Sequence, residues 1–96
     1  RWGNPTVDQL ERKLANLEGA ETCIAFGSGM AAITALMMQH LGQGDHLLIS
    51  DVTYAAAAEL PLDLLPRMGI RITRVNMSDL HAVQKALEPE TRLISI

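Results

Sequence analysis

The most constraining feature of the sequence is a turn of glycine and serine, Gly27-Ser28-Gly29, between two apolar runs. The run 21–26 before it predicts a buried strand, and the run 30–41 after it predicts a helix. A turn from a strand into a helix presents backbone N–H groups and the positive end of the helix dipole. Glycine lets a ligand approach the backbone closely. The turn is therefore a predicted anion site, typically for phosphate.

Helices and strands alternate along the chain after an irregular arm, 1–5. The expected helices are 7–18, 30–41, 55–68 and 80–87, and the expected strands are 21–26, 46–50, 70–75 and 92–96. This alternation predicts an α/β fold with a mostly parallel sheet and right-handed crossovers. Ligands bind such sheets at the carboxyl ends of the strands. The segments 27–30 and 51–54 both follow strands, so one site built from both is expected.

Capping residues predict where these helices begin and end. Thr6 is the expected N-cap of the first helix, and Gly19 is its expected terminator. Gly69 is expected to end the third helix. Either Ser78 or Asp79 is expected to cap the fourth.

Composition bears on how the core is built. Aromatic residues make up only 3% of the chain, so aliphatic residues and methionine must fill the core. The run 30–41 is apolar on nearly all sides, which predicts burial against the sheet and against another subunit. Met37 and Met38 are expected in the core, because methionine fills irregular gaps. Cys23 is expected to be a small, buried apolar residue of its strand.

Charge and cysteine content argue against several classes of protein. The net charge is −3, and no cluster of Lys and Arg predicts contact with nucleic acid. No apolar run reaches the roughly 18 residues of a membrane-spanning helix, and no signal peptide is visible. One cysteine excludes a disulfide framework and fits a reduced, cytoplasmic setting. The histidines His40, His46 and His81 lack metal-ligand spacing, so no metal site is predicted.

Two phosphate-bearing cofactors fit the turn. The G-x-G-x-x-A pattern of 27–32, with Asp51 about 20 residues on, is typical of the Rossmann domain of an NAD(P)-dependent dehydrogenase. A Rossmann unit usually opens with its glycine-bearing strand, whereas an arm and an amphipathic helix come first here. Asp51 is otherwise expected as a helix cap or loop acceptor. In the second interpretation, Gly29 and Met30 donate N–H groups to the phosphate of pyridoxal phosphate, and Tyr54 covers its ring.

Several different short motifs are spread along the whole length of the chain. They are Arg1-x-Gly3-Asn4-Pro5-Thr6, Leu10-Glu11, Leu17-Glu18-Gly19, Ser28-Gly29-Met30-Ala31-Ala32, Gly44-Asp45, Asp51-x-x-Tyr54, Gly69-Ile70 and Thr91-Arg92-Leu93-Ile94. Together they resemble the Cys/Met-metabolism (trans-sulfuration) family of pyridoxal-phosphate enzymes, which includes cystathionine γ-synthase, cystathionine β- and γ-lyases and methionine γ-lyase. The resemblance implies a fold-type-I, PLP-dependent transferase-like domain. Residues 1–96 would be a single partial domain, the N-terminal part of its large cofactor-binding domain.

The resemblance also implies roles for individual residues. Arg1 matches the family's arginine that reaches the neighbouring subunit's site and binds the cofactor phosphate. Gly29 and Met30 match the residues whose N–H groups bind the same phosphate. Tyr54 matches the tyrosine that stacks on the ring and assists proton transfer or leaving-group departure. These roles imply a homo-oligomer, either a dimer or a tetramer.

The implied reaction is elimination or replacement at the β- or γ-carbon of a sulfur amino acid or an activated homoserine, a small-molecule substrate. The family's Schiff-base lysine lies further along, so these residues alone are expected to be inactive. Lys13 and Lys85 are expected on the surface. At 54–57 the chain has Tyr-Ala-Ala-Ala where the family often has Tyr-Gly-Gly-Thr. A dehydrogenase domain and a non-catalytic folded module remain the alternatives.

Overall fold

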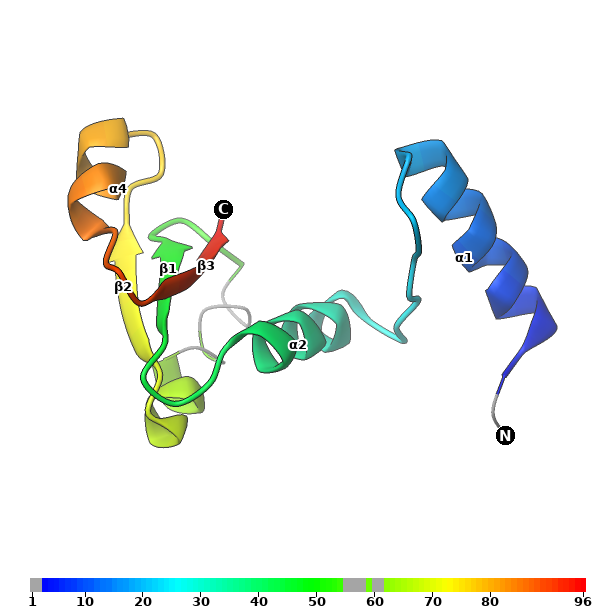
Figure 1. Ribbon diagram of the computed structural model, residues 1–96, viewed down its shortest axis with the longest axis horizontal. Coiled ribbons are helices and arrows are strands. Elements are labelled where there is room, and N and C mark those ends of the chain that lie inside the picture. Colours follow the sequence, from blue (N-terminus) through cyan, green and yellow to red (C-terminus); the bar gives the residue numbers. More distant parts are fainter. Residues whose placement is uncertain (1–2, 55–58, 60–61) are drawn as a thin grey trace. The chain divides into compact units, whose positions relative to one another are not determined.

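A computed structural model describes residues 3–54, residue 59 and residues 62–96 of the chain (Figure 1). The chain divides into two compact units, of which the first extends to Ala32 and the second begins at Ile33. The first unit contains helix α1 (Pro5–Glu18) and the start of helix α2 (Gly29–His40). The described residues of the second unit contain the rest of α2, a parallel sheet and short helical segments.

Helix α1 begins two residues earlier than the sequence predicts. Asn4 is its N-cap, and the Asn4 side chain accepts a hydrogen bond of 3.0 Å from the backbone N–H of Thr6. The prediction that Thr6 caps this helix is therefore wrong. Pro5 occupies the first helical position, where its missing N–H costs nothing. Gly19 ends the helix as predicted, in the left-handed conformation with φ 68°.

The segment 21–26 follows α1 without regular secondary structure, so the strand predicted there is wrong. A strand needs a neighbour for its backbone groups, and the strands of the described residues pair only with one another. Ile24 and Phe26 are 68% and 45% exposed rather than buried. The N–H of Ala25 donates instead to the Glu11 carboxylate of α1 at 2.7 Å. Cys23 is half-buried in an irregular segment, not buried in a strand.

The second unit is organised around a three-stranded sheet in the order β2-β1-β3 (Figure 1). The strands are β1 (His46–Ser50), β2 (Arg71–Val75) and β3 (Thr91–Ser95). Both pairings are parallel, which confirms the predicted sheet type. All residues of the central strand β1 are buried. Burial along a whole strand explains its nearly continuous apolar sequence.

A compact aliphatic core covers one face of this sheet. It consists of Met37, Leu41, Leu47, Ile49, Leu65 and Ile70. Met37 belongs to α2 and Leu41 directly follows that helix, whereas Leu47 and Ile49 belong to β1. Leu65 opens the 3-10 helix η1 (Leu65–Met68), which Gly69 ends as predicted, and Ile70 follows that glycine. The expected helix 55–68 falls partly on 55–58 and 60–61, which lie outside the described residues. Leu62 and Asp63 are helical.

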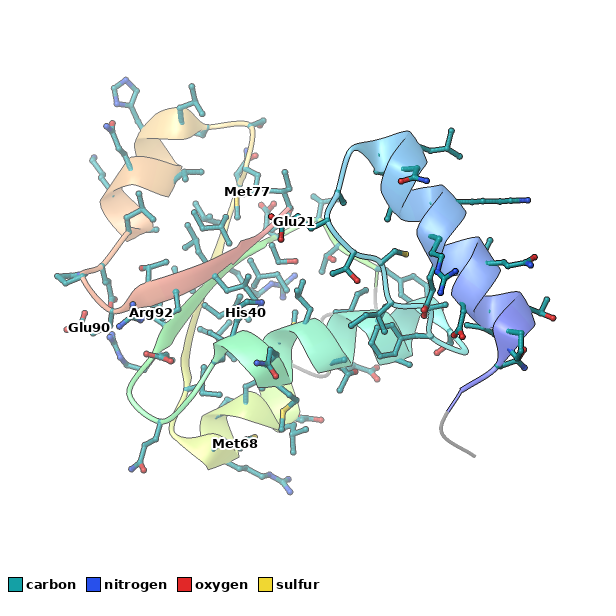
Figure 2. The ribbon with its side chains drawn as sticks, turned by 45° about the vertical axis from the view of Figure 1, so that its right-hand side comes forward. Glu21, His40, Met68, Met77, Glu90 and Arg92 are labelled. Atoms are coloured by element: carbon teal, nitrogen blue, oxygen red, sulfur yellow. The ribbon has the colours of Figure 1, made fainter. Side chains whose placement is uncertain are left out.

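Helix α4 (Leu80–Ala86) connects β2 to β3 and packs beside β2. Asp79 caps it by accepting hydrogen bonds from the N–H groups of His81 and Ala82, as one of the two predicted caps. Charged side chains gather where the strands begin. Glu90 and Arg92 flank the start of β3 (Figure 2), and Arg92 pairs with Asp45 at 3.6 Å. Such exposed pairs contribute little to stability.

Helix α2 is buried by the described residues on one side only. Met37 is 2% exposed, whereas its neighbour Met38 is 43% exposed, so the expectation that both lie in the core is confirmed for Met37 and wrong for Met38. Leu36 is also half exposed. Burial of this second side against another subunit stays a prediction.

The two adjacent methionines offer a matched test of this one-sided burial. Met37→Ala is expected to lower the free energy of unfolding by about 2–4 kcal/mol, because it leaves a cavity in a packed core. Met38→Ala is expected to cost less, about 0.5 kcal/mol in a dissociated subunit, because the described residues leave its side chain 43% exposed. Urea unfolding of the complete protein measures both values. A loss for Met38→Ala as large as that for Met37→Ala would show that the second side of α2 is buried as well, as the predicted subunit contact requires.

Candidate cofactor site

The start of α2 forms the candidate phosphate site. Ser28 caps the helix, since its carbonyl accepts from the N–H of Ala32 at 3.2 Å and its hydroxyl accepts from the N–H of Ala31 at 3.1 Å. Gly29 and Met30 are then the first two helical residues. Helix N-termini attract anions through their N–H groups and the helix dipole. The predicted helix start is confirmed to within one residue.

Open space at this turn fits a phosphate group. Among the described residues, no heavy atom outside the local backbone lies within 4 Å of a Cβ added at Gly27 or Gly29. Their backbones have negative φ angles, so protein packing and backbone strain do not require glycine at either position. Close approach of a ligand is a physical reason that remains. The turn therefore suits the phosphate that the sequence predicts.

Tyr54 lies in the loop that follows β1, at the carboxyl end of the central strand. Its side chain is 71% exposed. This is the predicted position relative to the sheet. Gly29 and Met30 belong to the first unit and Tyr54 to the second. Stacking of Tyr54 on a ring held by the α2 N-terminus stays a prediction.

The loop between β1 and Tyr54 is held through its backbone. The N–H of Asp51 donates to the carbonyl of Val75 at 3.0 Å, which extends the ladder between β1 and β2 by one residue. The carbonyl of Asp51 accepts from the Arg74 guanidinium at 2.8 Å. No local sequence pattern indicates a role for Arg74, because its contact depends on the register that sets Arg74 beside Ile49.

The remaining residues with predicted roles are an arginine and two lysines. Arg1, the predicted phosphate ligand across a subunit interface, lies outside the described residues. Lys13 and Lys85 are exposed on α1 and α4, as expected for surface lysines. Neither lysine is part of the candidate site.

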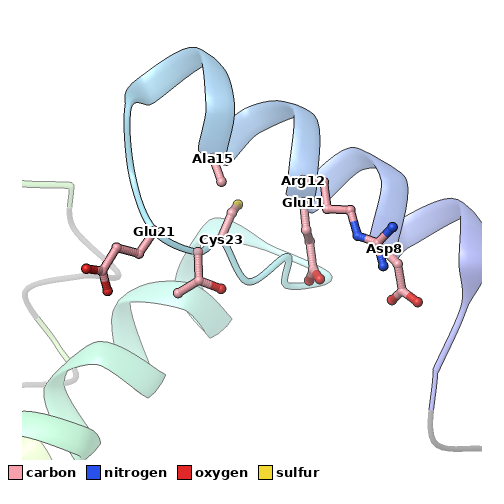
Figure 3. A pocket seen from close by; sticks show the side chains of 7 residues that line it. Asp8, Glu11, Arg12, Ala15, Glu21 and Cys23 are labelled. Carbon is pink, nitrogen blue, oxygen red and sulfur yellow. The ribbon is translucent and has the colours of Figure 1, made fainter.

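A hollow of about 270 Å³ lies between α1 and the segment that follows it (Figure 3). Asp8, Glu11 and Glu21 contribute carboxylates to it, and Arg12 contributes a guanidinium. The excess of negative charge disfavours an anionic ligand. This hollow is therefore not a second phosphate site.

His46 has a structural place in the sheet. It is fully buried, and its Nδ1 and Nε2 atoms lie 2.7 Å and 2.8 Å from the hydroxyls of Thr91 and Thr73. Both ring nitrogens therefore have partners, as buried polar groups require. Residues 3–54, 59 and 62–96 contain no group of histidine, cysteine or acidic side chains that could hold a metal ion. Within the same ranges, no helix is long and apolar enough to cross a membrane.

Together, the parallel sheet and the glycine-bearing helix start define an α/β protein of the class that binds phosphate-bearing cofactors at helix N-termini. Comparison with known sequences identifies the family. The profile of the family described as Cys/Met metabolism PLP-dependent enzyme matches residues 1–96, and the chain belongs to this family. The cofactor of the family is pyridoxal phosphate, and the family assignment leaves the dehydrogenase interpretation without support.

Curated relatives match across most or all of the chain. Canavanine gamma-lyase of Pseudomonas canavaninivorans is 48% identical over 86 residues, which are 88% of this chain and 22% of that protein. Cystathionine gamma-lyase of Bacillus subtilis is 42% identical over 96 residues, which are 100% of this chain and 25% of that protein. The chain thus spans about a quarter of the length of these relatives.

Solved structures show the same fold. The metB protein of Corynebacterium glutamicum is similar with a TM-score of 0.93 and 36% identity, over 98% of this chain and 24% of that one. The metY protein of Campylobacter jejuni is similar with a TM-score of 0.87 and 32% identity, over 95% of this chain and 22% of that one. The latter structure contains N′-pyridoxyl-lysine-5′-monophosphate. The predicted PLP-dependent α/β fold is therefore confirmed.

Proposed function

We propose that this chain is the N-terminal part of the large domain of a pyridoxal-phosphate enzyme acting on sulfur amino acids or activated homoserines. The reaction is elimination or replacement at the β- or γ-carbon. The observation that carries the proposal is the Ser28-capped start of α2, with Gly29 and Met30 as its first residues, in a chain of this family. The related proteins named for canavanine, cystathionine and methionine support this substrate class.

The residues have distinct roles in this proposal. Gly29 and Met30 bind the cofactor phosphate through backbone N–H groups, because a dianion is stabilised by several donors at a helix N-terminus. Arg1 adds a guanidinium from a neighbouring subunit, which requires a dimer or tetramer. Tyr54 would cover the ring with its aromatic face and hold a proton near the leaving group. The cofactor, when bound, supplies an electron sink for the carbanion.

Two properties of the complete protein accompany this function. It works as a homo-oligomer, since a residue from one subunit completes the site of another. It acts in the cytoplasm, a reducing compartment that suits the free cysteine Cys23. No nucleic-acid or membrane partner is required.

The purified complete polypeptide tests the proposal. It is expected to be yellow, and borohydride is expected to discharge the colour and leave the cofactor covalently attached after denaturation. A substrate panel of cystathionine, methionine, canavanine and the O-acyl homoserines with a thiol then distinguishes the reactions. An α-keto acid with ammonia indicates elimination, and a new thioether indicates replacement. A colourless protein that retains a nicotinamide cofactor would contradict the proposal.

A further inference from the structure

The loop that carries Tyr54 is fixed at one peptide unit, the one joining Asp51 to Val52. The carbonyl of this unit accepts from Nη2 of Arg74 at 2.8 Å. The N–H of the same unit donates to the hydroxyl of Ser50 at 3.2 Å. Because both polar groups of one planar peptide are held, the direction in which the chain leaves β1 is set two residues before Tyr54.

The Arg74 guanidinium is used for the hydrogen bond to the Asp51 carbonyl. Arg74 is an exposed residue of β2, and its register partner on β1 is Ile49. Within the described ranges, its guanidinium forms no ion pair with a carboxylate, unlike Arg71 and Arg92. A charged donor to a carbonyl is stronger than a neutral one. Among the described residues, the hydrogen bond to the loop backbone is therefore the only hydrogen bond or ion pair of this side chain.

We propose that Arg74 is a positioning residue, which holds the Asp51–Tyr54 loop so that the Tyr54 ring and hydroxyl are presented in one orientation. The inference rests on the proposed function of Tyr54. The hydrogen bond from Asp51 to Val75 fixes the loop at its start, and the Arg74 guanidinium fixes it one peptide further on. Small displacements of an aligned group reduce a rate steeply, so loosening this peptide is expected to affect turnover.

The test compares Arg74→Gln with Arg92→Gln in the complete enzyme. Arg92 is also an exposed strand arginine, but it pairs with Asp45 at the opposite ends of the strands. Arg74→Gln is expected to lower kcat by about three- to tenfold with KM changed less than about twofold, consistent with loss of one charged hydrogen bond. The visible circular dichroism of the bound cofactor is expected to change in the same variant. Arg92→Gln is expected to alter neither quantity.

A double-mutant cycle with Tyr54→Phe separates positioning from a general effect on folding. If Arg74 acts through the Tyr54 hydroxyl, Arg74→Gln is expected to cost less than about twofold in the Tyr54→Phe background. Arg74→Lys, which keeps one charged donor, is expected to recover part of the rate. Additive losses in the cycle, or an unchanged Arg74→Gln enzyme, would overturn the positioning role alone. A wild-type protein without bound pyridoxal phosphate would overturn the proposed function and this inference together.

Discussion

Replacing Gly29 with aspartate in the complete protein is expected to weaken the binding of pyridoxal phosphate by about 30- to 1,000-fold. A carboxylate at the first residue of α2 would lie beside the proposed phosphate, and like charges about 4 Å apart repel by a few kcal/mol in a protein environment. The helix itself tolerates the change, because an acidic side chain suits its first turn. The described residues also leave room, with no atom within 4 Å of the added Cβ.

Gly29→Asn is the matched control, since asparagine has nearly the same size as aspartate and no charge. We expect it to weaken binding by less than about tenfold, which isolates the electrostatic part of the effect. Absorbance titration of each apoprotein with the cofactor measures affinity, and thermal unfolding checks that each variant folds. A Gly29→Asp protein that folds normally and binds as tightly as the wild type would show that the phosphate is not held by this helix.

Tyr54→Phe is expected to lower kcat by about 10²- to 10³-fold while the cofactor remains bound. Phenylalanine keeps the aromatic face that covers the ring but lacks the hydroxyl that holds a proton near the leaving group. Stability is expected to stay unchanged, because the Tyr54 side chain is 71% exposed in the described structure. Steady-state kinetics with the preferred substrate and the amount of cofactor per subunit measure the two effects separately.

A more severe variant and a control variant help to interpret the Tyr54→Phe result. Tyr54→Ala removes the ring as well, so it is expected to lower cofactor affinity by about tenfold in addition to the loss of turnover. Leu80→Ala truncates another well-exposed side chain, on α4, and is expected to leave kcat within about twofold. Full activity of Tyr54→Phe would show that the Tyr54 hydroxyl has no role in catalysis, which would leave at most contact of the side chain with the ring.

Local sequence patterns predicted most of the elements that form. Strand β1 has the predicted bounds, His46–Ser50, because a short apolar run between turn residues is a local signal. Gly19 and Asp79 act where predicted, since a cap depends on the few residues around it. The one failed strand, 21–26, has a similar apolar pattern but no partner strand among the described residues. Apolar composition alone does not distinguish the two cases.

The features of the candidate site also fall into two groups, those set by neighbours along the chain and those set by contacts between distant segments. The sequence by itself determined that a helix follows the glycine-bearing turn, with a start correct to within one residue, and that Tyr54 follows a buried strand, because both depend on neighbours along the chain. Only the tertiary structure decided the strand order β2-β1-β3 and the contact of Arg74 with the Asp51 carbonyl. Strand order and register arise from contacts between segments far apart in the chain, and no local propensity encodes which segments will meet.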